Sequence, residues 1–557
     1  MPSDYLTKQL IAYIGNKRSL LPFLARVFAD LRNGKDNPVF LDPFCGSGSV
    51  SRLAKSLGFR TKANDWEPYA QTVTAAHVGI NKNELDHLFL ERGGVREIFH
   101  ELNCLGRTAF EGGYISRNYA PAYTEKADYR YERLFYTTEN ARFIDAVRDR
   151  IESWYPPGIL DEAAQKEKNL LLSSLLYEAA THANTSGVFK AFHKGFGGHG
   201  KDALFRIMHN MHLEIPVLID MPFPCTVSCL AAHQFVKEET GDICYLDPPY
   251  NGHQYGSNYF MLNTIVFWDK PPVSEERTRD GGFLEKAGIR KDWAQRKSDF
   301  CSAEKAPDVF SNLLDRIDAR YIVVSYNTEG VIPLHDLCDL LSSQGSLSIQ
   351  SENYVKYRGG RQSINRSTHN MEFLLVCERG ALPAPGERAK IDRYFAERRL
   401  VSLLRHSYSP KRITMEFSCE DAGVLLFEEG PARISLPMDY FFRFSAVPEP
   451  GFFHLLSNKD LLRLEGKLER ACCLDRAEEC SILLELLDME LPGKKQRELQ
   501  KRLLRVMKKF AFRKYQQQFH EIFLQVKGRV DEDPDKYKKL KPGLMEMKRV
   551  AELRFNG

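Results

Sequence analysis

The sequence predicts an α/β fold with a doubly wound sheet, a helical insert and a mainly helical C-terminal domain. Two observations predict the sheet: short β-branched or apolar runs alternate with amphipathic runs of helix length, and two of these runs end in turns rich in glycine or proline. The composition, 43% hydrophobic and 27% charged residues, is typical of a folded protein. It argues against a disordered, collagen-like or disulfide-stapled chain, and 557 residues allow three or four domain-sized units.

The strands and helices are expected in alternating order along the first 380 residues. The predicted strands are residues 39–41, 60–63, 226–229, 242–246, 321–325, 347–351 and 372–377. The predicted helices include residues 18–31, 50–57 and 310–317. This alternation predicts a parallel sheet with helices on both faces. Between residues 81 and 224 longer helical patterns dominate, such as 140–153 and 169–184, which predicts an inserted helical subdomain.

A segment rich in Pro and Gly at residues 380–386 predicts a domain boundary, because it cannot continue a helix or strand. Residues 381–557 hold 34 Lys/Arg and 27 Asp/Glu, a net charge of +7, which leaves residues 1–380 at −3. We therefore predict three parts: a sheet domain, a helical insert and a basic C-terminal accessory domain. Their bounds are 1–80 with 225–380, 81–224, and 381–557.

Several classes of protein are disfavoured by what the sequence lacks. The longest apolar runs are too short for a membrane helix and the first residues do not form a secretory signal, so we expect a cytoplasmic protein without a membrane partner. The cysteines lie mostly in apolar runs, and the Cys225/Cys229 pair has no second pair beside it, so no metal site is predicted. The net charge of +4 neither implies nor excludes a nucleic-acid partner.

The first informative motif joins a buried strand to a helix through a glycine-containing turn at residues 42–48. Such a turn lets a ligand approach the backbone at the carboxyl edge of a sheet, although an ordinary tight turn explains it equally well in isolation. About 20 residues later a second strand ends near Asp65, where folds of this class place a carboxylate against a ribose diol. Asp65 could equally cap the following helix.

The second motif, Asp247-Pro248-Pro249-Tyr250, is more specific. It follows a buried strand, and its two prolines stiffen the chain and remove backbone donors. The Asp247 carboxylate and the carbonyl before the second proline can both accept hydrogen bonds from a planar exocyclic amine, while Tyr250 can stack on its ring. The pattern therefore predicts a rigid site for the amino group of a base. The less favoured interpretation is that the two prolines only end the strand.

These motifs resemble the adenine-specific amino-group DNA methyltransferases, in the Dam-like group whose cofactor motifs precede the recognition insert and the Asp-Pro-Pro-Tyr motif. The resemblance covers about two thirds of the chain and implies a Rossmann-like methyltransferase sheet. It also implies S-adenosylmethionine as cofactor, base flipping of the target, and direct methyl transfer without a covalent intermediate. The Pro-Cys nucleophile motif of carbon-5 cytosine enzymes is absent, which agrees with this mechanism.

The resemblance also assigns the site residues. Asp247, Pro248, Pro249 and Tyr250 match the catalytic motif. The residues implied in cofactor binding are Tyr13, Gly15, Lys17, Asp42, Phe44, Gly46, Gly48, Asp65 and Trp66. One position departs from the family, because Ala231-Ala232 stands where an Asp-Ala pair usually meets the cofactor adenine, and His233 is a weak candidate to substitute.

Two basic segments are candidates for DNA contacts. The loop around Lys194 and Lys201 mixes cations, glycines and aromatic residues, and it lacks the Ser/Thr that a phosphate-binding NTPase loop needs. A glycine-rich surface loop without DNA contacts remains the alternative there. A second basic segment lies between the last two predicted strands and could read bases as well as phosphates. Its candidate residues are Lys356, Arg358, Arg361, Asn365 and Arg366.

The C-terminal domain gives the weakest functional signal. Residues 491–529 hold twelve Lys/Arg and two Glu on a helical pattern, which fits either a DNA-tracking face or a solvated one. A nuclease motif is not found, so a fused restriction activity is not expected. The domain is expected to extend target recognition or to dock a partner.

Together the motifs predict a site-specific DNA methyltransferase that acts on the N6 amino group of adenine in duplex DNA, within a restriction-modification or related host-defence system. Duplex DNA and a cognate restriction endonuclease are the expected partners. Two alternatives stay open: methylation of cytosine N4, which the same site would orient, and a non-catalytic DNA-binding regulatory module, which the Ala231-Ala232 departure would permit.

Overall fold

A computed structural model describes most of the chain. The described residues are 3–105, 112–158, 160–198, 201–279, 281–328, 330–351, 372–404, 406–420, 424–429, 432–437, 453–490 and 493–556. They form two compact units, one comprising the described residues up to 351 together with 372–384, and one comprising those from 385 onward. Each unit is described by itself below.

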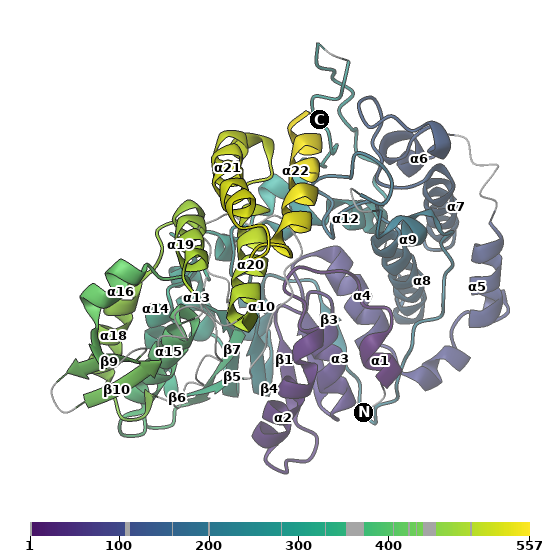
Figure 1. The fold of residues 1–557 in the computed structure, drawn as a ribbon. Helices are drawn as coiled ribbons and strands as arrows, with labels where there is room; N and C mark the ends of the chain where they lie inside the picture. Colours follow the sequence, from purple (N-terminus) through teal and green to yellow (C-terminus); the bar gives the residue numbers. More distant parts are fainter. Residues whose placement is uncertain are drawn as a thin grey trace. The chain divides into compact units, whose positions relative to one another are not determined.

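The first unit is built on a seven-stranded sheet (Figure 1) with the strand order β3-β2-β1-β4-β5-β7-β6. Its strands are β1 (Val39–Asp42), β2 (Arg60–Asn64), β3 (Thr226–Ser228), β4 (Thr240–Leu246), β5 (Asp318–Asn327), β6 (Gly345–Ser351) and β7 (Glu372–Arg379). All seven predicted strands are present. The central strands β1 and β4 are buried along most of their length, which explains why both read as continuous apolar runs.

The expectation of a wholly parallel sheet was wrong at one strand. β7 pairs antiparallel with both β5 and β6, while β1 pairs parallel with β2 and β4, and β4 pairs parallel with β5. Strands that are consecutive in the chain, such as β6 and β7, can pair antiparallel without a crossover helix. The β-branched and apolar residues that predict a strand do not determine its direction.

Helices cover both faces of this sheet, as the sequence predicts. The helices near the sheet are α1 (Ser3–Thr7), α2 (Leu21–Arg32), α3 (Ser49–Ser56), α4 (Pro68–Val78), α10 (Ala232–Glu238), α13 (Ala306–Leu314) and α14 (Leu334–Ser342). Leu374 and Val376 of β7 pack in one core with α2 and α3, whereas Cys377 contacts α14. Because successive strand residues point to opposite faces, α2 and α14 lie on opposite sides of the sheet.

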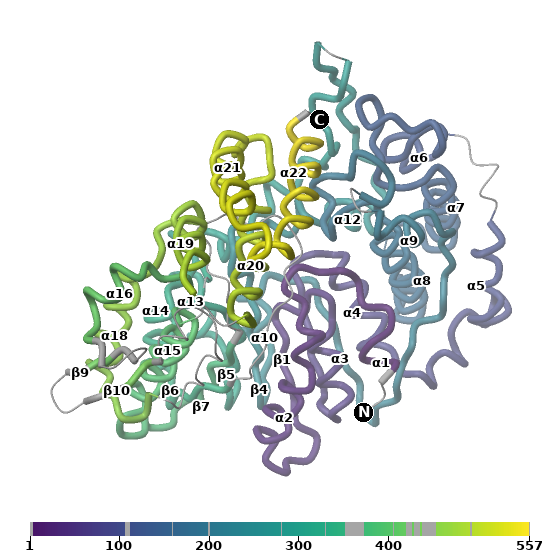
Figure 2. The backbone as a smooth tube through the Cα atoms, in the orientation of Figure 1, coloured from purple at the N-terminus to yellow at the C-terminus, as the bar shows by residue number. Residues whose placement is uncertain are grey.

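The region between β2 and β3 is helical and leaves the sheet before the chain returns at β3 (Figure 2). Its helices are α5 (Val95–Cys104), α6 (Tyr114–Tyr119), α7 (Thr138–Trp154), α8 (Glu162–Thr181) and α9 (Leu204–Met208). The side chains of Thr137 and Asp161 cap α7 and α8 by accepting from backbone N–H groups three residues on. The helices α5 to α8 share a core with α4 and with α12 (Phe260–Phe267), which follows α11 (Tyr255–Asn258).

The second unit is mainly helical and contains a small antiparallel sheet. Its helices are α15 (Glu387–Leu403), α16 (Pro410–Glu416), α18 (Asn458–Ala471), α19 (Arg476–Asp488), α20 (Gly493–Met507), α21 (Gln516–Glu532) and α22 (Leu540–Asn556). The strands β8 (Ser418–Glu420), β9 (Val424–Glu429) and β10 (Ala432–Pro437) pair in the order β10-β9-β8. One apolar core joins α15, α16 and α18, and another joins α19 to α22. None of the helices in the described part of the chain is long and apolar enough to cross a lipid bilayer.

Candidate functional site

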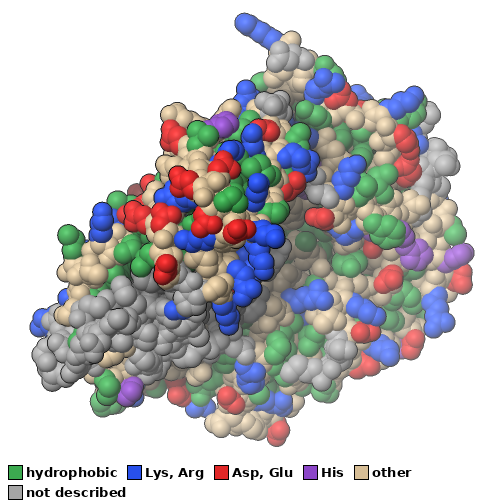
Figure 3. All heavy atoms as spheres, in the orientation of Figure 1, with side chains coloured by type: hydrophobic (Ala, Val, Ile, Leu, Met, Phe, Trp, Pro, Cys, Tyr) green, Lys and Arg blue, Asp and Glu red, His purple; other side chains and the backbone are tan. Residues whose placement is uncertain are grey.

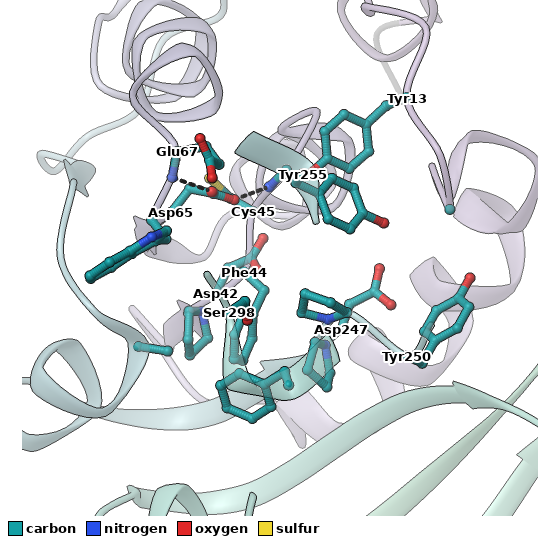
Figure 4. A pocket seen from close by; sticks show the side chains of 18 of the residues that line it. Tyr13, Asp42, Phe44, Cys45, Asp65, Glu67, Asp247, Tyr250, Tyr255 and Ser298 are labelled. Carbon is teal, nitrogen blue, oxygen red and sulfur yellow. Dashed lines mark hydrogen bonds between the residues drawn. The ribbon is translucent and has the colours of Figure 1, made fainter. Parts of the chain in front are cut away.

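A cavity of about 270 Å³ lies at the carboxyl edge of the sheet (Figure 4). β1 ends at Asp42, β2 is followed by Asp65, and β4 is followed by Asp247. These three strands are parallel neighbours, so their ends meet at one edge and all three carboxyl groups line the cavity. Every residue that the sequence assigned to catalysis or cofactor binding lines this cavity, except Gly48.

The turn after β1 depends on two glycines with different roles. Gly46 has a φ of 52°, and a Cβ there would lie 2.9 Å from the ring of Tyr13, so the turn can approach that ring only as glycine. Gly48 has a φ of 74° and lies at the start of α3, where a Cβ would lie 2.8 Å from the Thr74 hydroxyl of α4. Gly48 therefore permits close helix packing.

Asp65 ties the turn after β1 to the turn after β2. Its two carboxylate oxygens accept hydrogen bonds from the backbone N–H groups of Gly46 and Glu67, both at 2.8 Å (Figure 4). Glu67 occupies the cap position of α4, so Asp65 is not the helix cap that the sequence left open as an alternative. Asp65 fixes the geometry of the cavity wall while its carboxylate remains part of the lining.

Asp42 carries an oxygen that is available to a ligand. The side chain is 1% exposed, and one oxygen accepts from the Ser51 hydroxyl. The other oxygen, Oδ1, is buried and accepts no well-aligned hydrogen bond among the described residues, although the Phe44 backbone N–H lies near enough to the carboxyl group to lower its pKa. A buried acceptor of this kind is costly unless something donates to it, so the cavity suits a ligand with a donor at this point.

The cavity is strongly acidic. Burial raises the pKa of Asp42 to about 7, and the nearby charges of Asp247 and Asp65 add to the effect. Burial likewise raises the pKa of Asp65 to about 7, although two backbone N–H groups oppose the shift. Glu67 also lines the cavity, and burial raises its pKa as well. A cluster of desolvated carboxyl groups favours a cationic ligand, because a positive charge stabilises their ionised forms.

One cation already reaches into this cluster. The Lys17 ammonium lies 3.0 Å from Oδ1 of Asp247, and Lys17 is 2% exposed. The same ammonium lies 5.2 Å from the centre of the Tyr250 ring, which in turn packs edge-on against Tyr326 at 5.8 Å. The amino-terminal motif and the Asp-Pro-Pro-Tyr motif, 230 residues apart, thus form one charge-paired unit.

The segment 292–301 forms a wall of the cavity that sequence reasoning missed. Ser298 and Gln254 exchange two hydrogen bonds of 2.8 and 3.0 Å, and Phe300 packs edge-on against Phe44 at 5.2 Å. The Arg296 guanidinium stacks over Trp66 and donates to its carbonyl oxygen. The segment has no strand or long-helix periodicity, so its sequence gives no signal of this position.

An aromatic stack on Tyr13 was also missed. Tyr259 lies parallel to Tyr13 at 5.1 Å, and Tyr255 stacks on it at 5.2 Å. The Tyr259 hydroxyl accepts from the Ile14 backbone N–H at 2.7 Å, and the Tyr255 hydroxyl donates to the Ile14 carbonyl at 3.2 Å. The stack holds the amino-terminal motif against the cavity. Both tyrosines follow closely on the Asp-Pro-Pro-Tyr motif, within residues 251–259.

Comparison with known proteins identifies this arrangement. Residues 13–280 match the family model described as D12 class N6 adenine-specific DNA methyltransferase. The match includes Lys17, Asp42, Asp65 and Asp247. This match covers just under half of the chain, and it shows that residues 13–280 are similar to that class of enzyme. The matched residues therefore include the whole carboxylate cluster, whereas the segment 292–301 lies beyond them.

Relatives of the chain are methylases. Modification methylase LlaI of Lactococcus lactis subsp. lactis is 26% identical over 367 residues, which are 65% of this chain and 54% of that protein. Type II methyltransferase M.NlaIII of Neisseria lactamica is 28% identical over 382 residues, 66% of this chain and 99% of that protein. Type II methyltransferase M.FokI of Planomicrobium okeanokoites is 26% identical over 368 residues, 65% of this chain and 52% of that protein.

The chain spans about half the length of the LlaI and FokI methylases and nearly all of M.NlaIII. About a third of this chain is unmatched in each of these alignments. No solved structure matches the chain.

Of the residues expected to contact DNA, Lys194 and Lys201 do not line this cavity. Lys194 and Lys201 are exposed in the insert, and the Lys194 ammonium lies 5.3 Å from the centre of the Tyr129 ring. Lys356, Arg358, Arg361, Asn365 and Arg366 lie outside the described residues. No group of three or more metal-ligating side chains gathers among the residues that the structure describes.

We expect Lys17→Gln to lower kcat for methyl transfer by about 100-fold, with a smaller effect on the KM for DNA, because Lys17 positions Asp247 rather than holding the duplex. Steady-state kinetics with tritium-labelled methyl donor measure both constants. Lys17→Arg keeps the charge and should recover part of the rate.

Arg18→Gln is the matched control, because it removes the same charge from an exposed neighbour of Lys17. Its kcat should stay close to that of the unmodified protein. A Lys17→Gln variant with normal kcat would contradict a positioning role for the ion pair with Asp247.

Proposed function

We propose that this chain is a site-specific DNA methyltransferase that transfers a methyl group from S-adenosylmethionine to the N6 amino group of adenine in duplex DNA. The observation that carries the proposal is the meeting of Asp247, Asp42 and Asp65 in one cavity. In this cavity a cationic methyl donor and a planar amine would lie next to each other. The similarity of residues 13–280 to the D12 class supports the same reaction.

The cavity fits S-adenosylmethionine by charge. This molecule carries an ammonium and a sulfonium group, and when bound it supplies an electrophilic methyl group. The buried Oδ1 of Asp42 would accept from the ammonium, which would satisfy this oxygen and lower the pKa of that carboxyl group. Asp65 would face the ribose hydroxyls, and Trp66 would lie against the adenine, held by Arg296.

The target amine would be held by the rigid turn after β4. The Asp247 carboxylate and the Pro248 carbonyl would accept its two hydrogens, and the Tyr250 ring would stack on the base. Lys17 stabilises the ionised Asp247 and holds its carboxylate in place. A base within a duplex cannot reach this cavity without leaving the stack, so we propose that the adenine is flipped out at a cost of a few kcal/mol.

The relatives support a place in host defence. The LlaI protein is a modification methylase, and M.NlaIII and M.FokI are type II methyltransferases. We propose that this chain likewise protects host DNA from a cognate restriction endonuclease carried on a separate polypeptide. The recognition sequence would be read by the insert and by residues 356–366.

The decisive experiment is modification-sensitive sequencing of a host that expresses the protein, combined with mass spectrometry of its nucleosides. We expect N6-methyladenine at one recurring sequence. N4-methylcytosine in its place would support the cytosine alternative, and no modified nucleoside together with no detectable binding of S-adenosylmethionine would support the non-catalytic module.

The variant Asp247→Ala should lose methylation while still folding, with a lowered thermal unfolding midpoint because the buried Lys17 ammonium loses this partner. Asp308→Ala, on the exposed face of α13, is the control for loss of a carboxylate and should keep full activity. Substantial methylation by Asp247→Ala would overturn the catalytic assignment.

Binding of S-adenosylmethionine should strengthen as the pH rises from 6 to 8. Asp42 and Asp65 have raised pKa values of about 7, so part of their population is protonated below that pH. A cationic ligand favours the ionised forms, and protons must leave when it binds at lower pH. Isothermal titration calorimetry in buffers with different ionisation enthalpies measures both the affinity and the proton release.

Asp42→Asn removes one of these groups and should weaken binding and flatten its dependence on pH. A dissociation constant that stays the same across this range in the unmodified protein would argue against the proposed contact between the carboxyl cluster and the cationic donor.

A further inference from the structure

The second unit carries a row of cations on one face of α20. Its members, hereafter the α20 stripe, are all exposed: Lys494, Arg497, Lys501, Arg505 and Lys508. They are separated by three or four residues, the spacing that keeps side chains on one face of a helix. Lys508 follows the last residue of α20, and its N–H still donates to the Leu504 carbonyl at 3.0 Å, so it continues the helical turn. The stripe is about 21 Å long at 1.5 Å per residue.

Packing fixes the orientation of this stripe. The opposite face of α20 contributes Leu499, Leu503 and Met507 to the core shared by α19 to α22. Arg502 is buried at the side of the helix, where its guanidinium pairs with Glu479 at 2.9 Å. Rotation of α20 would expose the apolar face, so the cations are held outward. Figure 3 shows Lys and Arg side chains gathered along α20.

Charge pairing distinguishes this stripe from the other helices of the unit. On α21 and α22, cations are matched by neighbouring acids, as in Lys527 with Asp531 and Lys548 with Glu552. In the α20 stripe, Lys501 pairs with Glu498 at 2.9 Å. The other four members form no ion pair within 4.0 Å in the part of the chain that the structure describes.

The pKa of Glu498 indicates that the local electrostatic potential is positive. The hydrogen bond of this carboxylate with Lys501 lowers its pKa, and the charges of Lys501, Arg505 and Lys494 lower it further. A solvated helix face normally mixes both signs of charge to limit self-repulsion, whereas this face concentrates one sign. An extended partner of opposite charge would relieve that repulsion.

We propose that the α20 stripe binds the phosphate backbone of duplex DNA and anchors the enzyme on its substrate without reading sequence. The partner follows from charge complementarity and length: duplex DNA presents one negative charge per about 1.7 Å of its axis, so 21 Å of helix faces a dense row of phosphates. The inference rests on the proposed function for the choice of DNA. It assigns a role to a helix beyond the residues that the family model matches.

Phosphate contacts fix a protein on the duplex but carry no sequence information. The stripe would therefore raise the affinity for any duplex equally. Its contribution would be lost as salt rises, because binding releases counterions from the phosphates.

The test compares two full-length variants with the same loss of charge. One replaces the four unpaired members of the stripe by Gln: Lys494→Gln, Arg497→Gln, Arg505→Gln and Lys508→Gln. The control replaces four exposed lysines elsewhere in the same unit: Lys411→Gln, Lys538→Gln, Lys539→Gln and Lys541→Gln. Fluorescence anisotropy with a labelled duplex measures the association constant at several salt concentrations, with and without the recognition sequence.

In the stripe variant, the slope of log K against log salt should fall in magnitude by about 3 to 4, at about 0.9 per lost contact. The ratio of specific to non-specific affinity and kcat at saturating DNA should stay the same, and the control should keep the slope of the unmodified protein. An unchanged slope in the stripe variant, or an equal change in the control, would overturn the proposal.

Two further outcomes are informative. One distinguishes DNA from other ligands of the stripe, and the other distinguishes failure of the binding proposal from failure of the proposed activity. If the stripe variant keeps its DNA slope but loses binding to duplex RNA or to an acidic protein, the DNA assignment is overturned. If the unmodified protein methylates no DNA while its stripe still sets the salt slope, the proposed activity fails and the binding surface stands.

Discussion

Three carboxyl groups, two of them buried, gather at one edge of the sheet, and this is the constraint on which the rest of the site depends. β2, β1 and β4 are parallel neighbours, so Asp65, Asp42 and Asp247 meet at their carboxyl ends. Burial raises the pKa of Asp42 and Asp65 to about 7, which measures how unfavourable the ionised forms are there. The surroundings must therefore offset negative charge. Backbone N–H groups do this for Asp65, and Lys17 does it for Asp247.

Asp42 is the carboxyl group whose negative charge the surrounding residues offset least. Ser51 donates to one of its oxygens, and the other, also buried, accepts no well-aligned hydrogen bond among the described residues. A protein gains no stability from such an atom, so its persistence at a cavity wall is best explained by a ligand that donates to it. The proposed methyl donor has an ammonium group of the required charge. The loop 292–301 contributes Ser298 and Phe300 to the lining of the same cavity.

Much of the sheet and its edge could be predicted because buried parallel strands are continuous apolar runs that end in diagnostic turns. The direction of β7 could not, since both directions use the same residues. The start of α8 at Glu162 was missed because its first turns are polar and depend on the Asp161 cap, whereas apolar periodicity begins only near residue 169. Lys17 and Asp247 were each named from motifs, but their contact joins positions 230 residues apart and required the fold. The segment 292–301 has no periodic pattern at all.

The acidity of the cavity also explains why the molecule's positive charge lies elsewhere. A site that favours a cationic donor repels the phosphates of a duplex, so attraction to DNA must come from surfaces outside it. In the described part of the chain, such charge occurs at Lys194 and Lys201 of the insert and in the α20 stripe. Under the proposed function, separating the two charged regions would let each act on its own ligand. The cavity would favour the small cationic donor, and the basic surfaces would hold the DNA, of which only the target base enters the cavity. The near-neutral total of +4 is the sum of these opposed regions.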